Sequence, residues 1–212
     1  MKALMLITTM FFIIYSSHAG PSKYEEAMQE NISKLYASRT VEEYQEVINK
    51  FDRIAAMETD KWEPLYYAGF GYIMMATESK EATVKDKYLD LALEKITAGT
   101  KLQPQESELI ALEGFVHMIR VTVDPATRGA QYSGLSMQAY GRAVELNPDN
   151  PRALYLMAQI EYGTAQFFGS DTGEACAKLE LAIEKFDTYV PDSPLAPAWG
   201  KGGAIASMER CK

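Results

Sequence analysis

The residues that could carry chemistry are few. The chain has two histidines, His18 and His117, and His18 lies in the leader described below. His117 follows Glu113 by four residues, so both side chains would share one helix face and could hold a metal ion between them. The alternative, which we favour, is a packing histidine bonded to Glu113 or to a backbone carbonyl. A single remaining histidine argues against histidine-rich metal cages and histidine-based triads.

Three methionines, Met74, Met75 and Met118, suggest a Cu(I) site, because thioethers select that ion. No Met-x-x-Met motif supports such a site, and methionine at helical spacing is more often a core residue or an adaptable contact. Gly69-Phe70-Gly71 lacks the preceding strand of a phosphate-binding glycine loop. The carboxylates show no catalytic spacing and are expected to form a solvated acidic face. We therefore expect no enzyme activity and no cofactor.

The two cysteines, Cys176 and Cys211, could form a disulfide. An even number of cysteines in an exported chain favours a bridge. If the last two helices are antiparallel, Cys176 opens one and Cys211 closes the other, so both lie at the same end. Such a bridge would stabilise the protein by ~3 kcal/mol. The alternative is two buried free thiols.

The N-terminal 19 residues have the pattern of a secretory signal peptide. Lys2 precedes a mostly apolar run over residues 3–15, and Ser17-His18-Ala19 is a small-x-small cleavage pattern before Gly20. The run is shorter than the ~20 residues that a membrane span needs. We predict a signal peptide at 1–19, one domain at 20–212, and a periplasmic or secreted protein. The alternative is an uncleaved membrane anchor.

The charge and hydropathy of the chain exclude several partners. The formal net charge is −8, and no basic stripe is evident. This argues against binding to nucleic acids and to anionic lipid surfaces. No second apolar stretch is long enough for a bilayer, so we expect no membrane insertion of the mature chain.

The candidate residues lie within a sequence repeat. A large-x-x-x-small pattern recurs every 44 or 45 residues, at Leu65–Gly69, Ile110–Gly114, Leu154–Ala158 and Trp199–Gly203. A fixed period of this size indicates stacked helix-turn-helix units, in which the small residue lets the paired helix approach closely. Proline and loop residues separate the periodic segments. We predict helices near 22–38, 41–57, 62–77, 84–101, 106–122, 134–147, 151–167, 173–187 and 195–210.

Residues 41–208 resemble an array of tetratricopeptide repeats. The second-helix motif of that family, Ala-x3-Phe/Tyr-x2-Ala-x2-Leu-x-Pro, is matched by Ser136, Tyr140, Ala143, Leu146 and Pro148. Three further units match less fully, at Ala92, Ile96, Gly99, Leu102 and Pro104; at Val47, Phe51, Ile54 and Met57; and at Leu179, Ile183 and Phe186. The resemblance implies an all-α, right-handed superhelix of about four helical hairpins and a C-terminal capping helix.

The period departs from that of the tetratricopeptide family, which is 34 residues. We assign the excess to longer loops inside the pairs, near 77–84, 123–134 and 168–173. HEAT repeats have a period nearer to this one and are the rival architecture.

The resemblance also implies a concave face lined by the first helix of each pair. Its groove-facing slots hold aromatic and flexible apolar side chains: Tyr66, Phe70, Ile73, Phe115, Met118, Tyr155, Gln159 and Tyr162. Such side chains suit a recognition surface, since they offer a large area at modest entropic cost. The alternative is that they pack inside a tight superhelix without an open groove. The basic and asparagine clamp of chaperone-binding members is absent.

We therefore predict an exported, non-enzymatic scaffold whose groove binds a peptide or protein segment. The second hypothesis is a carrier in which the same aromatic wall closes over a small apolar ligand. The third is a metal-dependent activity at Glu113 and His117. The identity of the partner does not follow from the groove.

Overall fold

The computed structural model describes residues 20–212, so the predicted signal peptide lies outside the described residues. Nine α-helices occupy this range. They are α1 (Lys23–Ala37), α2 (Val41–Met57), α3 (Glu63–Glu78), α4 (Ala82–Leu102), α5 (Ser107–Val123), α6 (Pro125–Leu146), α7 (Pro151–Phe168), α8 (Gly173–Thr188) and α9 (Lys201–Met208), which a short 3-10 turn, η1 (Glu209–Cys211), extends.

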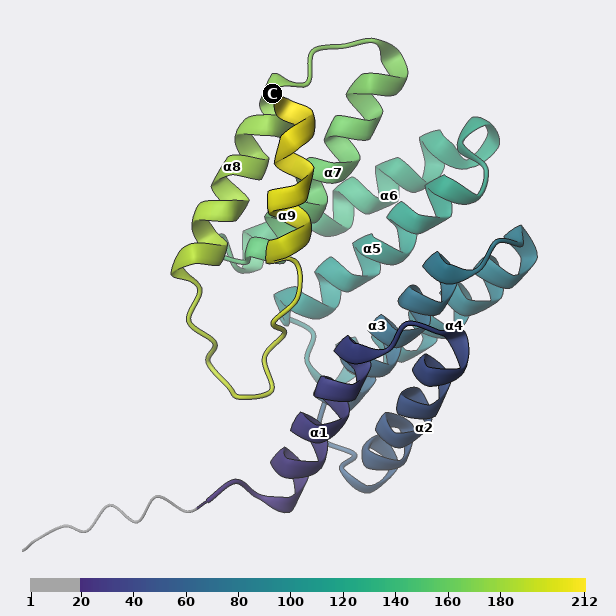
Figure 1. The fold of residues 1–212 in the computed structure, drawn as a ribbon, viewed down its shortest axis with the longest axis vertical. Helices are drawn as coiled ribbons and strands as arrows, with labels where there is room; N and C mark the ends of the chain where they lie inside the picture. Colours follow the sequence, from purple (N-terminus) through teal and green to yellow (C-terminus); the bar gives the residue numbers. More distant parts are fainter. Residues whose placement is uncertain (1–19) are drawn as a thin grey trace, which may run out of the picture.

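The helices form antiparallel pairs that stack in chain order, with α9 closing the stack against α8 (Figure 1). The predicted all-α, tetratricopeptide-like repeat fold of four hairpins and a closing helix is confirmed. None of the helices between residues 20 and 212 is long and apolar enough to cross a membrane.

The small residues of the repeat permit close helix contacts, as predicted. A Cβ atom on Gly69 of α3 would lie 3.0 Å from Ile96 Cγ1 of α4, and one on Gly114 of α5 would lie 2.5 Å from Tyr140 Cε1 of α6. A larger side chain at Gly114 would therefore push α5 and α6 apart. The recurring pattern sets how closely the first helix of a pair approaches the second.

The long repeat period comes from long helices, and the assignment to longer internal loops is wrong. Only Asp124 separates α5 from α6. Asp124 caps α6 by accepting a hydrogen bond from the Thr127 N–H at 3.2 Å, and Pro125 occupies the first helical position. The sequence prediction places a loop over 123–134, but an aspartate followed by proline is also a helix start. Hence α6 has 22 residues and begins nine residues before the predicted 134.

The last helix is shorter than predicted, because it begins at Lys201 and not at 195. Pro197 lacks an N–H group and disfavours helical geometry at the residue before it. Gly200 then adopts φ 108°, a conformation that favours glycine. Residues 189–200 therefore cross the molecule as a non-helical connection, which we call the C-terminal strap; Figure 1 shows it as the long loop between α8 and α9.

The end of the chain is tied to α8. Cys176, in the first turn of α8, forms a disulfide with Cys211, the last residue of η1. The two helices also pack through Leu179 and Phe186 of α8 and Ala204 of α9. The strap is thus held at both ends, by α8 and by the bonded end of the chain.

Candidate ligand-binding site

The C-terminal strap covers the concave face that the sequence predicts as a groove. Trp199 of the strap stacks on Phe70 at a centroid distance of 4.9 Å and on Phe115 at 5.9 Å. Both phenylalanines are predicted groove residues. The aromatic wall is therefore present, and a side chain of the same molecule lies against it.

Hydrogen bonds fix the strap in this position. The Tyr67 hydroxyl donates to the Leu195 carbonyl at 2.7 Å. The Ala198 N–H donates to the Tyr36 hydroxyl at 3.2 Å. Leu195 itself is buried. The strap is consequently an integral part of the helical stack, with its backbone bonded to α1 and α3.

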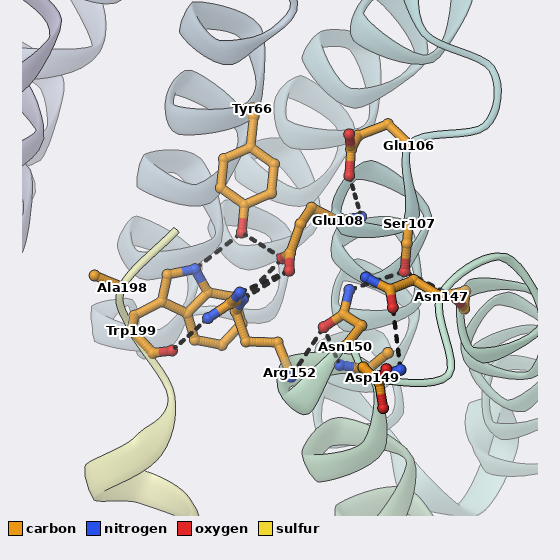
Figure 2. Close-up of polar contacts among 12 residues, drawn as sticks. Tyr66, Glu106, Ser107, Glu108, Asn147, Asp149, Asn150, Arg152, Ala198 and Trp199 are labelled. Carbon is orange, nitrogen blue, oxygen red and sulfur yellow. Dashed lines mark hydrogen bonds and ion pairs between the residues drawn. The ribbon is translucent and has the colours of Figure 1, made fainter. Parts of the chain in front are cut away.

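Beneath the strap lies a buried ion pair between Glu108 of α5 and Arg152 of α7 (Figure 2). The Arg152 Nε donates to both carboxylate oxygens at 2.9 Å. The Tyr66 hydroxyl contacts the same carboxylate at 3.4 Å and accepts a hydrogen bond from Trp199 Nε1 at 2.9 Å. The Tyr189 ring lies 4.6 Å from the guanidinium. These contacts connect three repeats and the strap through one carboxylate.

The electrostatics of this cluster suit a structural role. Burial acts to lower the pKa of Arg152, but the charge and hydrogen bonds of Glu108 together raise it above its usual value. Burial, and then the charge of Glu108, raise the pKa of Tyr66 well above its usual value. Arg152 therefore stays charged and Tyr66 stays a hydroxyl donor at neutral pH. The charges of the pair are satisfied within the protein, so the cluster offers no free charge to a ligand.

The predicted groove residues fall into three groups. Tyr66, Ile73, Phe70 and Tyr162 are buried, with exposures of 0%, 0%, 6% and 8%, so they are not available to a partner on this surface. Phe115 and Tyr155 are partly buried beneath the strap and α9. The remaining two residues, Met118 and Gln159, line a cavity to which no residue of the strap contributes.

This cavity, which we call the apolar cavity, has a volume of about 430 Å³ and lies between α5, α6 and α7. Its size falls within the ~300–1,000 Å³ typical of ligand sites. Its walls come from the last turns of α5, the first turns of α6 and the last turns of α7. They are Met118, Ile119, Val121, Thr122, Pro125, Ala126, Gly129, Ala130, Ser133, Gln159, Ile160, Gly163, Thr164, Phe167 and Phe168.

Small side chains create the space. Ala126, Gly129 and Ser133 of α6 recur at helical spacing and present a narrow face toward α7. Across the cavity, a Cβ atom on Gly163 of α7 would meet nothing within 4 Å, and the same holds for Gly129. The two facing helices therefore leave between them a volume that no side chain of the described residues fills.

Two exposed phenylalanines end the cavity. Phe167 and Phe168 are 69% and 72% exposed and meet edge to face, with ring centroids 5.2 Å apart. They are the last residues of α7, which Gly169 terminates in the left-handed conformation. An exposed apolar patch of this kind is a candidate binding surface. Phe167 and Phe168 extend the apolar wall to the end of α7.

The lining of the cavity carries no ionisable side chain. Its polar groups are the hydroxyls of Thr122, Ser133 and Thr164 and the amide of Gln159. Met118 contributes the thioether, and its sulfur accepts a hydrogen bond from the Tyr140 hydroxyl at 3.8 Å. Such a lining, mostly apolar with a few hydroxyl and amide groups, is typical of sites for apolar ligands.

His117 does not line the apolar cavity. Its ring stacks on Tyr132 of α6 at a centroid distance of 6.0 Å. Its Nε2 lies 3.8 Å from a Glu113 carboxylate oxygen, and its Nδ1 is buried without a hydrogen-bond partner. Residues 20–212 contain no cluster of three or more His, Cys, Asp or Glu side chains that could hold a metal ion. Glu113 and His117 alone would therefore supply two ligands to a metal ion.

A second hollow, of about 490 Å³, lies between α1 and α2. It is lined by Ala27, Asn31, Ile54 and Ala56 and by the side chains of Lys50, Arg53 and Met57. Lys50 pairs with Glu46 at 2.9 Å. No aromatic side chain lines this hollow, which distinguishes it from the apolar cavity.

Of the residues that line the apolar cavity, the sequence prediction includes only Met118 and Gln159, and it assigns them to a peptide groove. The sequence prediction places Ala126, Gly129 and Ser133 in a loop over 123–134, so their helical spacing was not considered. Once α6 is started at Pro125, their spacing of three to four residues places them on one face. The adjacent Phe167 and Phe168 were a second signal of an exposed apolar surface, because they follow Tyr162, the last buried residue of α7.

The fold resembles solved structures. The haemophore HusA from Porphyromonas gingivalis matches with a TM-score of 0.81 and 27% identity, over 92% of this chain and 95% of that one. The tetratricopeptide protein TTC0263 from Thermus thermophilus matches with a TM-score of 0.48 and 14% identity, over 88% and 99%. MamA from Desulfovibrio magneticus RS-1 gives 0.34 and 16%, over 81% and 99%.

No protein-family model and no curated protein matches the chain. The match to HusA is consistent with the helical fold described above.

Proposed function

We propose that this protein is an exported, non-enzymatic carrier that binds haem, or a similar flat apolar molecule, in the apolar cavity. The observation that carries the proposal is the cavity itself: about 430 Å³ of unfilled space, without an ionisable lining residue and with Phe167 and Phe168 at its edge. Burial of a macrocycle there would remove apolar surface of both ligand and protein from water.

The similarity to HusA supports the choice of ligand. HusA is a haemophore, and it matches this chain over nearly the whole length of both proteins. The chemistry of the lining agrees with that ligand, because Met118 could coordinate iron and the surrounding walls would exclude water. Haem is the cargo in this proposal and takes no part in a reaction.

This proposal keeps the small-ligand carrier, our second hypothesis, but places the ligand in the apolar cavity and not against the aromatic wall of the groove. The aromatic wall that would close over the ligand is covered by the C-terminal strap, with Trp199 stacked on Phe70. The same cover makes capture of a peptide in the groove less favourable, because a peptide would have to displace hydrogen bonds such as that from Tyr67 to Leu195. The cavity needs no such displacement.

Titration of the protein with haemin, followed by absorbance in the Soret region, tests the proposal. We expect saturable one-to-one binding. The variant Gly163→Leu places a side chain in the cavity, where a Cβ atom has no neighbour within 4 Å. It should weaken haemin binding at least tenfold. Folding should not suffer, because leucine is a better helix former than glycine by ~1 kcal/mol.

Gly141→Leu is the matched control, because Gly141 of α6 also has open space at its Cβ position and does not line the cavity. This variant should bind haemin as the unmodified protein does. Absence of haemin binding to the unmodified protein would refute the proposal. Equal binding by the Gly163 and Gly141 variants would place the ligand elsewhere.

A further inference from the structure

Arg210 lies beside the apolar cavity and forms no ion pair with a carboxylate of residues 20–212. The side chain of Arg210, in η1, donates from Nη2 to the Gln159 side-chain oxygen. Gln159 belongs to the lining of the cavity. The guanidinium of Arg210 therefore lies one hydrogen bond away from the cavity wall.

The position of Arg210 is defined by several contacts. Its guanidinium carbon lies 4.9 Å from the centroid of the Tyr162 ring, and the Tyr162 hydroxyl donates to the Arg210 carbonyl at 3.0 Å. The next residue, Cys211, is bonded to Cys176 of α8. A residue two positions from the end of the chain is thus held against α7 from both its backbone and its side chain.

Other cationic side chains on α5, α6 and α8 already form ion pairs with carboxylates. Arg128, next to Gly129, contacts Asp86 at 2.8 Å, and Arg120 contacts the same carboxylate at 3.4 Å. Lys178 of α8 pairs with Glu161. Arg210, in contrast, has no ion pair within residues 20–212 and retains free N–H donors.

We propose that Arg210 binds a carboxylate of the ligand, so that the site selects flat apolar molecules that carry an acidic group at one edge. This inference rests on the proposed function and adds the residue that orients the cargo. The macrocycle lies against the apolar walls, and the carboxylate reaches the edge of the cavity at Gln159. Arginine suits this role because its planar guanidinium can donate two parallel hydrogen bonds to a carboxylate.

The test compares haemin with its dimethyl ester, in which both carboxylates are blocked. Binding of each compound is measured for the unmodified protein and for Arg210→Gln, which keeps a polar side chain of similar length. We expect Arg210→Gln to weaken haemin binding about five- to tenfold, since charge-assisted hydrogen bonds at an exposed position are of that order. Binding of the ester should stay unchanged.

Lys212→Gln provides the control for loss of a positive charge. Lys212 is an exposed cation two residues away that pairs with Glu209 at 2.7 Å, and its removal should affect neither compound. Equal weakening of haemin and ester by Arg210→Gln would show a structural effect and overturn the carboxylate contact, as would no weakening of either. If the unmodified protein binds neither haemin nor its ester, the proposed function itself is refuted. If it binds both compounds but Arg210→Gln does not weaken haemin binding selectively, the proposed function stands and only the role of Arg210 is refuted.

Discussion

Arg152 carries a charge in the interior of the stack, with 1% of its surface exposed. Its compensation comes from one carboxylate, Glu108, at 2.8–2.9 Å. A buried pair of this kind adds little net stability, because desolvation of both charges offsets their attraction. Removal of one partner, however, leaves the other charge buried and uncompensated. The pair therefore acts mainly to fix how α5, α7 and the strap meet.

We expect Arg152→Met to lower the free energy of unfolding by about 3–5 kcal/mol, measured by chemical denaturation. The double variant Glu108→Leu/Arg152→Met should be more stable than this single variant, because it leaves no unpaired charge. If the double variant loses the sum of the two single effects, the two side chains act independently and the paired account is incorrect.

At the scale of the elements, the sequence predicted the helices through their apolar spacing and the hairpins through the recurring small residues. It did not predict the start of α6 or the strap. In both places proline decided the structure, and its meaning depends on position. Pro125 follows a capping aspartate and begins a helix, whereas Pro197 interrupts one. The apolar cavity depends on the first of these, because the early start of α6 supplies one of its walls.

The strap and α9 form an element that a disulfide attaches to α8. The bond between Cys176 and Cys211 spans 35 residues. In the chain-entropy account a loop of this length corresponds to about 3–4 kcal/mol. The double variant Cys176→Ser/Cys211→Ser should therefore unfold at a clearly lower temperature than the oxidised protein, as measured by circular dichroism.

Reduction of the unmodified protein should produce the same shift in the melting temperature, and reductant should not affect the serine variant. A serine variant as stable as the oxidised protein would show that the packing of Leu179, Phe186 and Ala204 holds α9 without the bond.

On the scale of the whole molecule, the repeat builds a curved stack whose concave face is closed by its own C-terminal segment. The sequence could indicate the aromatic wall, because the repeat slots place Phe70 and Phe115 on one face. It did not indicate that Trp199 covers them, because the repeat pattern places Trp199 in the closing helix, whereas the structure places it in the strap before α9. The open surface is left at the side, between α5, α6 and α7.

The central claim is that the ligand occupies this apolar cavity. Amide chemical shifts of the isotope-labelled protein, recorded with and without protoporphyrin IX that carries gallium in place of iron, test it directly. We predict that the largest changes fall within residues 118–133 and 159–168, with residues 23–57 unaffected. The largest changes around Lys50 and Arg53 in the hollow between α1 and α2, or along the strap at residues 189–200, would contradict the account.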